Sequence, residues 1–121
     1  MASIPDVTHA TVATITLLSG FSIAADLSWN AANGRQIAYE IEKGNCLACH
    51  RIPGDPDANT MANMGPPLVA MKQRFPDRAR LRAQISDSMQ FNPNTAMPPF
   101  GRHGILTEKE IELVIDFLYT I

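Results

Sequence analysis

The sequence predicts an all-α fold in a single domain, and three observations lead to this prediction. The 121 residues are enough for one domain with a modest core. Proline-containing loops separate the apolar stretches, with no internal repeat and no βαβ pattern. Apolar residues near the C-terminus recur at the spacing of one helix face, namely Ile111, Val114, Ile115, Leu118 and Ile121.

The N-terminal segment divides the chain into two expected parts, residues 1–30 and a domain over residues 31–121. Residues 10–25 carry no lysine or arginine and end in small residues, as the apolar region of a secretory signal does. The preceding residues include Asp6 and no lysine or arginine. A secretory signal would need a basic residue there. Two interpretations therefore stay open, a cleaved signal and a retained extension. Gly20 interrupts the stretch, so we expect no membrane span.

The first helix of the domain is predicted to begin at a cap formed by Asn30 or Asn33 and to run to about Lys43. Asparagine is a favoured N-cap residue because its side chain accepts from free backbone N–H groups. Gly44 follows directly and is placed to end the helix. This helix would therefore lead straight into the segment that begins at Asn45.

Two pairs of residues predict the faces of this helix. Ile37 and Ile41 are four residues apart and are expected to share an apolar face. Gly34 and Ala38, also four apart, form a small-residue surface. Because these side chains add little bulk, another helix can approach closely there.

Three further helices are predicted after this one. Two short helices over residues 68–75 and 77–89 are separated by Pro76, which cannot continue a helix. The last helix starts at Thr107, where Thr107 and Glu110 have the spacing of a capping box. Its acidic first turn also complements the positive end of the helix dipole.

The chemistry of the chain is indicated by Cys46 and Cys49, which stand three residues apart with His50 directly after them. This CxxCH spacing is the attachment site of c-type haem, in which both thiols form thioethers and the histidine binds iron. A zinc site is disfavoured because the chain has no other cysteine, and His9 and His103 are distant without paired spacing. A dithiol redox motif is the other alternative, and the adjacent histidine disfavours it. We therefore expect one covalent haem c.

Charge excludes one class of partner and leaves a basic stretch to interpret. The formal net charge is −2, and no basic cluster alternates with aromatic residues, so nucleic acid is not expected as a partner. The basic stretch could attract an acidic partner or haem propionates, but a solvated helix face shared with Asp77 and Asp87 is favoured. Its members are Lys72, Arg74, Arg78, Arg80 and Arg82.

Met97 is the favoured sixth ligand of the iron. It precedes Pro98 and Pro99, which stiffen the loop that would present the thioether. His103 follows the same loop and is a competing ligand, with a surface histidine as its simpler interpretation. The order of haem segment, loops and amphipathic last helix resembles class I cytochromes c, in which the methionine ligand also lies shortly before the last helix.

The other methionines are expected to serve packing. Met71 and Met89 lie in predicted helices and are interpreted as core residues, the usual place of methionine. Met61 and Met64 fall in a loop and are expected to pack locally or to be exposed.

The segment Gly65-Pro66-Pro67-Leu68 resembles the Gly-Pro-x-Leu element of class I cytochromes. That resemblance implies that the carbonyl of Pro66 accepts a hydrogen bond from the second ring nitrogen of His50 and so orients the ligand. A rigid turn is the alternative interpretation.

Several segments together resemble SoxX, the small haem subunit family of the SoxAX sulfur-oxidation cytochromes. They are GNCLACH at 44–50, MGPPL at 64–68, NPNTAMPPFG at 92–101, ILT at 105–107 and ANGR at 32–35. The resemblance covers the chain from about Ala31 onward.

The resemblance implies a subunit of an L-cysteine S-thiosulfotransferase, a heterodimer that joins thiosulfate oxidatively to a cysteine of the SoxYZ carrier complex. This chain has no cysteine beyond the haem pair, so we expect no catalytic residue here and a catalytic cysteine in the SoxA partner. The haem would pass electrons to a downstream acceptor cytochrome. The expected location is the periplasm, where c-type haem is attached.

Two other functions remain open. A free-standing soluble monohaem cytochrome c would share every ligand argument, and a ligand-binding or peroxidase-like haem protein would lack the sixth ligand. Co-purification with a second cytochrome and the far-red charge-transfer band of methionine-bound iron(III) distinguish these possibilities.

Overall fold

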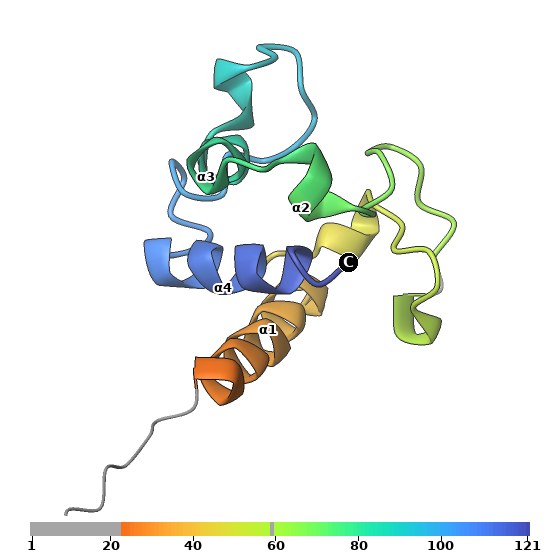
Figure 1. Ribbon diagram of the computed structural model, residues 1–121. Helices are drawn as coiled ribbons and strands as arrows, with labels where there is room; N and C mark the ends of the chain where they lie inside the picture. Colours follow the sequence, from red (N-terminus) through yellow and green to blue (C-terminus); the bar gives the residue numbers. More distant parts are fainter. Residues whose placement is uncertain (1–22, 59) are drawn as a thin grey trace, which may run out of the picture.

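The computed structural model describes residues 23–58 and 60–121, and this part of the chain is helical without strands. Figure 1 shows the helices joined by long loops. The helices are α1 (Ile23–Tyr39), α2 (Met71–Arg74), α3 (Arg78–Ser86) and α4 (Glu108–Leu118), and three 3-10 turns lie in the loops, η1 (Cys46–Ala48), η2 (Pro56–Ala58) and η3 (Ser88–Gln90). The predicted all-α fold is confirmed.

The first and last helices form the centre of the fold, and Figure 1 shows α1 passing across α4. Gly34 and Ala38 are both buried at this crossing. A Cβ atom on Gly34 would lie 1.8 Å from the carbonyl oxygen of Leu113 in α4. The backbones of α1 and α4 therefore lie so close that a side chain at Gly34 would not fit. This close approach agrees with the prediction from the small residues Gly34 and Ala38.

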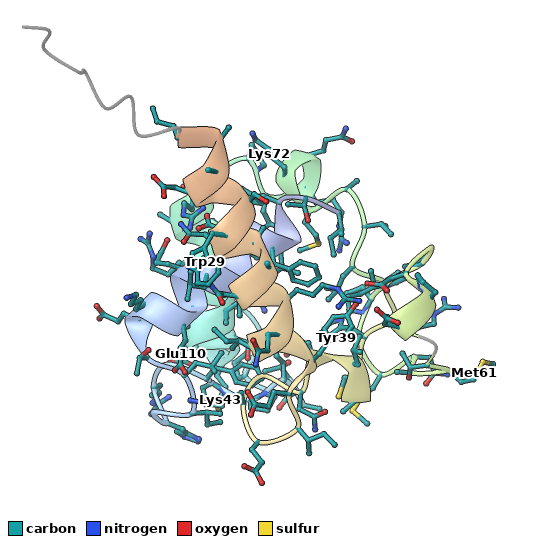
Figure 2. All side chains as sticks on the ribbon, turned by 90° about the horizontal axis from the view of Figure 1, so that it is seen from below. Trp29, Tyr39, Lys43, Met61, Lys72 and Glu110 are labelled. Atoms are coloured by element: carbon teal, nitrogen blue, oxygen red, sulfur yellow. The ribbon has the colours of Figure 1, made fainter. Side chains whose placement is uncertain are left out.

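The predicted bounds of the first helix are wrong at both ends. Helix α1 begins at Ile23, so the expected division between residues 30 and 31 falls inside a continuous helix. Ile23, Leu27 and Trp29 are exposed, and Figure 2 shows Trp29 beside this helix. The first two turns are thus helical without contributing to the core, and the signal-like residues 10–22 lie outside the described residues.

The end of α1 is set by a tight loop, and this helix stops at Tyr39, before Lys43. The N–H of Gly44 donates to the carbonyl oxygen of Ile37 at 3.0 Å, and a Cβ atom on Gly44 would lie 2.9 Å from that oxygen. Gly44 therefore permits a close return of the chain. Because the chain has left the helix at Ile41, that side chain is exposed and shares no face with Ile37.

The second predicted helix is much shorter than residues 68–75. Ala70 has a left-handed backbone with φ 49°, which a right-handed helix cannot include. Helix α2 therefore begins only at Met71. The N–H of Leu68 donates instead to the carbonyl oxygen of Arg51 at 2.8 Å. Helix α3 begins after Asp77, whose side chain accepts from the N–H of Ala79, and it ends at Ser86 because Asp87 has a non-helical backbone with φ −156° and ψ 84°. The separate turn η3 continues from Ser88.

Helix α4 is present as the predicted amphipathic last helix, and it supplies five of the fourteen buried apolar residues that the structure describes. The capping box is present, since Thr107 Oγ1 accepts from the N–H of Glu110 at 3.2 Å and Glu110 Oε2 accepts from the N–H of Thr107 at 2.8 Å. Buried residues of this helix are Ile111, Val114, Ile115, Phe117 and Leu118.

Among the described residues, no helix combines the length and the apolar character that a membrane crossing needs.

The interpretation of the basic stretch as a solvated helix face is wrong for Arg78. Its guanidinium bridges to α4, with N–O distances of 2.7 Å to both Glu112 and Asp116. Arg82 adds a second ion pair with Glu112. These pairs form because α3 lies against α4, a long-range contact that the local pattern does not reveal.

Candidate functional site

The CxxCH segment forms a single turn at the end of the loop after α1. The carbonyl oxygen of Cys46 accepts from the N–H groups of Cys49 at 3.2 Å and His50 at 2.9 Å. This turn brings the two thiols and the imidazole together, and all three residues line one cavity. The arrangement is the one that two thioether bonds to a single haem require.

A second segment holds the imidazole of His50 in place. Its Nδ1 atom lies 2.6 Å from the carbonyl oxygen of Pro66, the contact that the resemblance implied. The N–H of Gly65 donates to the carbonyl oxygen of Cys49 at 2.8 Å, which ties this segment to the CxxCH turn. A Cβ atom on Gly65 would lie only 2.3 Å from Cε1 of the His50 ring. Glycine is therefore required for the ring to lie where it does.

The cavity has a volume of about 480 Å³, within the range of ligand sites in proteins. Its lining combines the sulfur and imidazole groups with apolar side chains from α2, α3, α4 and the loops next to them. The apolar residues include Leu68, Met71, Phe75, Leu81, Ile85, Phe100, Leu106, Val114 and Leu118. A cavity with apolar walls, two thiols, an imidazole and a thioether fits a haem c, and this chain's residues supply every group that the cofactor needs.

Met97 lies at this cavity, half-buried, in the loop between η3 and α4. Its N–H donates to Thr95 Oγ1 at 3.1 Å, and Pro98 also lines the cavity. His103, the competing ligand, is exposed and is not part of the cavity lining. The geometry thus brings Met97 and His50 to one cavity and leaves His103 at the surface.

The remaining methionines differ in their surroundings. Met71 is buried in the core, as predicted, and it also lines the cavity. Met89 is exposed in η3, beyond the end of α3, so its interpretation as a core residue of a helix over residues 77–89 is wrong. Met61 is exposed, and Figure 2 shows it at the edge of the molecule. Met64 is exposed as well, with its sulfur 3.7 Å from that of Cys49.

Two observations bear on the alternative interpretations of the cysteine pair, a zinc site and a dithiol redox site. Within residues 23–58 and 60–121, no group of three or more His, Cys, Asp and Glu side chains is placed to hold a metal ion. Burial raises the pKa of the Cys46 thiol to about 11. A dithiol redox site needs the opposite, a thiol whose pKa is lowered so that the thiolate forms.

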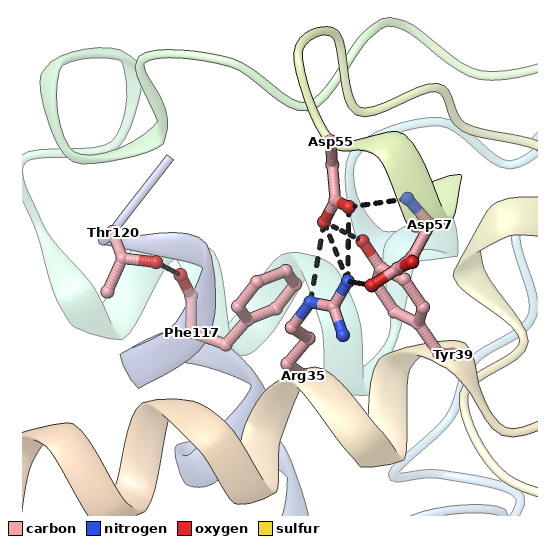
Figure 3. Close-up of polar contacts among 6 residues, drawn as sticks. All are labelled: Arg35, Tyr39, Asp55, Asp57, Phe117 and Thr120. Carbon is pink, nitrogen blue, oxygen red and sulfur yellow. Dashed lines mark hydrogen bonds and ion pairs between the residues drawn. The ribbon is translucent and has the colours of Figure 1, made fainter. Parts of the chain in front are cut away.

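Sequence reasoning missed an ion cluster that fastens the loop after the CxxCH segment to α1. Arg35 donates to Asp55 at 3.0 Å and to Asp57 at 2.8 Å, and the hydroxyl of Tyr39 donates to Asp55 (Figure 3). The guanidinium of Arg35 also lies 4.3 Å from the centre of the Tyr39 ring. No local signal pairs these residues, because the contact depends on the path of the loop.

The cluster shifts two pKa values in opposite directions. Burial, assisted by the hydrogen bond to Asp55, raises the pKa of Tyr39 to about 12. The pKa of Asp55 is lowered, first by the hydrogen bond from Tyr39 and then by the contacts from the N–H of Asp57 and from Arg35. The carboxylate of Asp55 is therefore held in its charged form while Tyr39 keeps its proton.

Other residues missed from the sequence lie at the cavity itself. Arg74 lines it and donates to the carbonyl oxygen of Pro67 at 2.8 Å. Gln84 lines it from α3, half-buried. The basic stretch drew attention to Arg74 only as one of five cations, and an isolated glutamine gives no sequence signal.

Comparison with known proteins gives one similar protein of undetermined function. An uncharacterized lipoprotein of Aquifex aeolicus (strain VF5) is 35% identical over 78 residues. The match covers 64% of this chain and 37% of that protein, so this chain spans little more than a third of its relative.

The comparison with protein families is decisive for the class of the chain. Residues 31–121 match the family described as Cytochrome c, which is most of the chain and includes the whole cavity described above. Proteins of this family carry covalently bound haem c and transfer electrons. The chain therefore belongs to the cytochrome c family, as an all-α electron-transfer protein with one covalently attached haem c.

Proposed function

We propose that this chain is the electron-relay subunit of a SoxAX-type cytochrome that couples thiosulfate to a cysteine of a carrier protein. The proposal rests on the order of five segments that resemble SoxX and on membership of the cytochrome c family. It also rests on the use of both cysteines at one site. The domain that carries this function corresponds to residues 31–121.

The proposed haem site uses five residues. Cys46 and Cys49 would hold the cofactor by thioether bonds, His50 and Met97 would be the iron ligands, and the carbonyl of Pro66 would orient His50. The single observation that carries this assignment is that His50 and Met97 line one cavity while His50 Nδ1 lies 2.6 Å from the carbonyl oxygen of Pro66. With Nδ1 donating to that oxygen, Nε2 is the nitrogen left to bind iron. When bound, haem c supplies exchange of one electron between iron(III) and iron(II).

The chemistry at sulfur belongs to the partner in this proposal. Coupling thiosulfate to a cysteine needs a reactive sulfur at the active site, and both thiols of this chain are used by the haem. The catalytic cysteine of the L-cysteine S-thiosulfotransferase is therefore assigned to a SoxA-type subunit. A SoxYZ-type complex would present the carrier cysteine, and a further cytochrome would accept the electrons.

The proposed location is the periplasm. Thioether attachment of haem is a feature of exported cytochromes, and the relative from Aquifex aeolicus is named a lipoprotein. Both features favour a protein that works outside the cytoplasm. Cell fractionation tests this location, because recovery of the haem-bearing chain only in the cytoplasm would contradict it.

The ligand set is tested by replacing Met97 and comparing it with an exposed methionine. Met97→Ala is expected to abolish the far-red charge-transfer band of iron(III) bound to methionine and to open the iron to imidazole. Met89→Ala removes an exposed side chain and should leave the band intact. A Met97→Ala protein that keeps the band would contradict the assignment, while loss of covalent haem in Cys46→Ser and Cys49→Ser tests the thioethers separately.

The assignment to a SoxAX-type complex is tested by its partner. Expression of the chain together with its native genomic neighbours should yield a stoichiometric complex with a second c-type cytochrome. That complex should couple thiosulfate to a SoxYZ-type carrier, whereas this chain alone should not. A strictly monomeric product that exchanges electrons rapidly with other cytochromes would favour a free-standing electron carrier instead.

A further inference from the structure

Met97 is held at both its main chain and its side chain by residues of one short segment. Ser88 is fully buried, and its hydroxyl donates to the carbonyl oxygen of Met97 at 2.8 Å. The amide nitrogen of Gln84 lies 3.9 Å from the sulfur of Met97, within reach of a long N–H···S hydrogen bond. Both donors therefore converge on a single methionine.

The position of these two residues follows from the local structure. Gln84 lies in the last turn of α3, and Ser88 begins η3 after the break at Asp87, yet the contacts of both residues reach Met97. The loop that carries Met97 is also tied to α3, because the N–H of Phe100 donates to the carbonyl oxygen of Ile85 at 3.2 Å. Arg78 joins the start of α3 to α4. The two donors thus come from a fixed support.

A methionine needs such support to act as a reliable ligand. Its side chain has three rotatable bonds and adapts readily to different surroundings, so the sulfur is not positioned by the backbone alone. The hydrogen bond from Ser88 fixes the main chain of Met97, and the amide of Gln84 restricts where the sulfur lies. Because Ser88 is fully buried, water cannot take the place of the Met97 carbonyl as the hydrogen-bond acceptor of its hydroxyl.

We propose that Gln84 and Ser88 are positioning residues that hold the Met97 thioether toward the iron and tune its strength as a ligand. The inference rests on the proposed role of Met97 and goes beyond it by naming the residues that control this ligand. A thioether sulfur has two lone pairs, one for iron and one that can accept from Gln84. A hydrogen bond to a ligand sulfur withdraws electron density from it, which disfavours iron(III) and raises the reduction potential.

The test uses the haem-loaded protein with two variants and one control. Ser88→Ala removes the hydroxyl, and Gln84→Leu removes the amide while keeping a similar volume. Gln90→Leu makes the same change at an exposed position of η3 and serves as the control. Imidazole affinity of the iron(III) form reports how firmly Met97 is held, because imidazole must displace it.

Both variants are expected to bind imidazole roughly fivefold more tightly than the parent protein, the change that loss of one hydrogen bond produces. Gln84→Leu should also lower the reduction potential, and Gln90→Leu should match the parent in both measurements. Parent-like imidazole affinity and potential in both variants would overturn the inference, even if Ser88→Ala melts at a lower temperature. Loss of thermal stability alone would show that Ser88 supports only the fold.

A separate outcome identifies failure of the proposed ligand. If Met97→Ala keeps the far-red band, Met97 is not the sixth ligand, and the inference falls with it. If Met97→Ala loses the band while Gln84→Leu and Ser88→Ala bind imidazole like the parent, only the inference falls. The two failures are therefore distinguishable.

Discussion

The Nδ1 atom of His50 lies 2.6 Å from the carbonyl oxygen of Pro66, and Gly65 makes this contact possible. A Cβ atom at Gly65 would lie 2.6 Å from that same Nδ1 and 2.3 Å from Cε1 of the ring. The backbone of Gly65 thus lies directly against the His50 ring, and no side chain at position 65 would fit between them. The orientation of the imidazole therefore depends on a residue that contributes no functional group.

Gly65→Ala is expected to displace the imidazole and to break its hydrogen bond to Pro66. Thioether attachment should survive, since Cys46 and Cys49 are unchanged, but the iron should bind His50 more weakly, by about 10-fold to 100-fold for loss of an orienting partner. Spectroscopic titration of the His50–iron bond with acid measures this loss. Pro66→Ala is the matched control, because the acceptor is a backbone carbonyl that alanine also provides. Equal behaviour of the two variants would contradict the steric argument.

Gly34→Ala is expected to destabilise the protein by about 2 kcal/mol, the usual cost of forcing extra volume into a packed contact. Whether Gly34→Ala lowers or raises stability distinguishes a packed contact from an unhindered helix position. At an unhindered helix position the same change would stabilise by up to about 1 kcal/mol, because alanine favours helix more than glycine does. Urea unfolding of the haem-loaded protein measures the difference, and a more stable variant would show that the crossing of α1 over α4 relaxes at no cost.

Features encoded by neighbouring residues were predictable from the sequence. The CxxCH turn, the capping box at Thr107 and the small-residue surface at Gly34 each depend on spacings within a few residues. The order of these segments also indicated the cytochrome fold, and the family comparison agrees. The five predicted site residues, Cys46, Cys49, His50, Pro66 and Met97, all line the cavity.

Features that depend on the path of the loops were not predictable. Helix α1 extends back to Ile23 although Ile23, Leu27 and Trp29 are exposed, and α2 starts late because Ala70 adopts a left-handed backbone. The contacts of Arg35 with Asp55 and of Ser88 with Met97 join residues that no periodic pattern connects. Such contacts are decided by tertiary packing, which overrides local preference.

Tyr39→Phe is expected to lower stability by about 1 kcal/mol at neutral pH, because it removes the hydrogen bond to Asp55. The pKa of Tyr39 is raised from 10.0 to about 12 in the folded protein. A group with a raised folded pKa contributes its stability below its unfolded pKa and loses it as the pH rises through the folded value. The advantage of the parent protein over the variant should therefore shrink as the pH rises from about 10 toward about 12.

Phenylalanine is a suitable replacement at this position because it keeps the ring. The stacking of Arg35 on the ring and the edge contact with Phe117 are preserved, so the variant isolates the hydroxyl. Urea unfolding at a series of pH values measures the effect. A stability difference that stays constant up to pH 12 would show that the hydroxyl does not titrate with the folded cluster.

Trp29→Ala is expected to change stability by less than about 0.5 kcal/mol, as for surface substitutions in general. The side chain is 70% exposed, on the part of α1 that precedes the matched domain. Phe117→Ala is the contrasting variant, since this ring is 4% exposed and its loss should cost about 3–5 kcal/mol. Thermal melting of both compares them directly. A large loss in Trp29→Ala would place the domain boundary before residue 31.

Arg78→Ala is expected to destabilise the protein by about 1–2 kcal/mol, because its guanidinium connects α3 to α4 through Glu112 and Asp116. The guanidinium also donates to the backbone carbonyl of Glu112 at 3.0 Å. Arg80→Ala is the control, since Arg80 is exposed on the same helix and its guanidinium lies over the ring of Phe91. Unfolding in low salt and in high salt separates the two contributions. Screening weakens the ion pairs but not the backbone contact, so part of the loss should persist in salt. Equal stability of Arg78→Ala and Arg80→Ala would mean that α3 is held against α4 by apolar contacts alone.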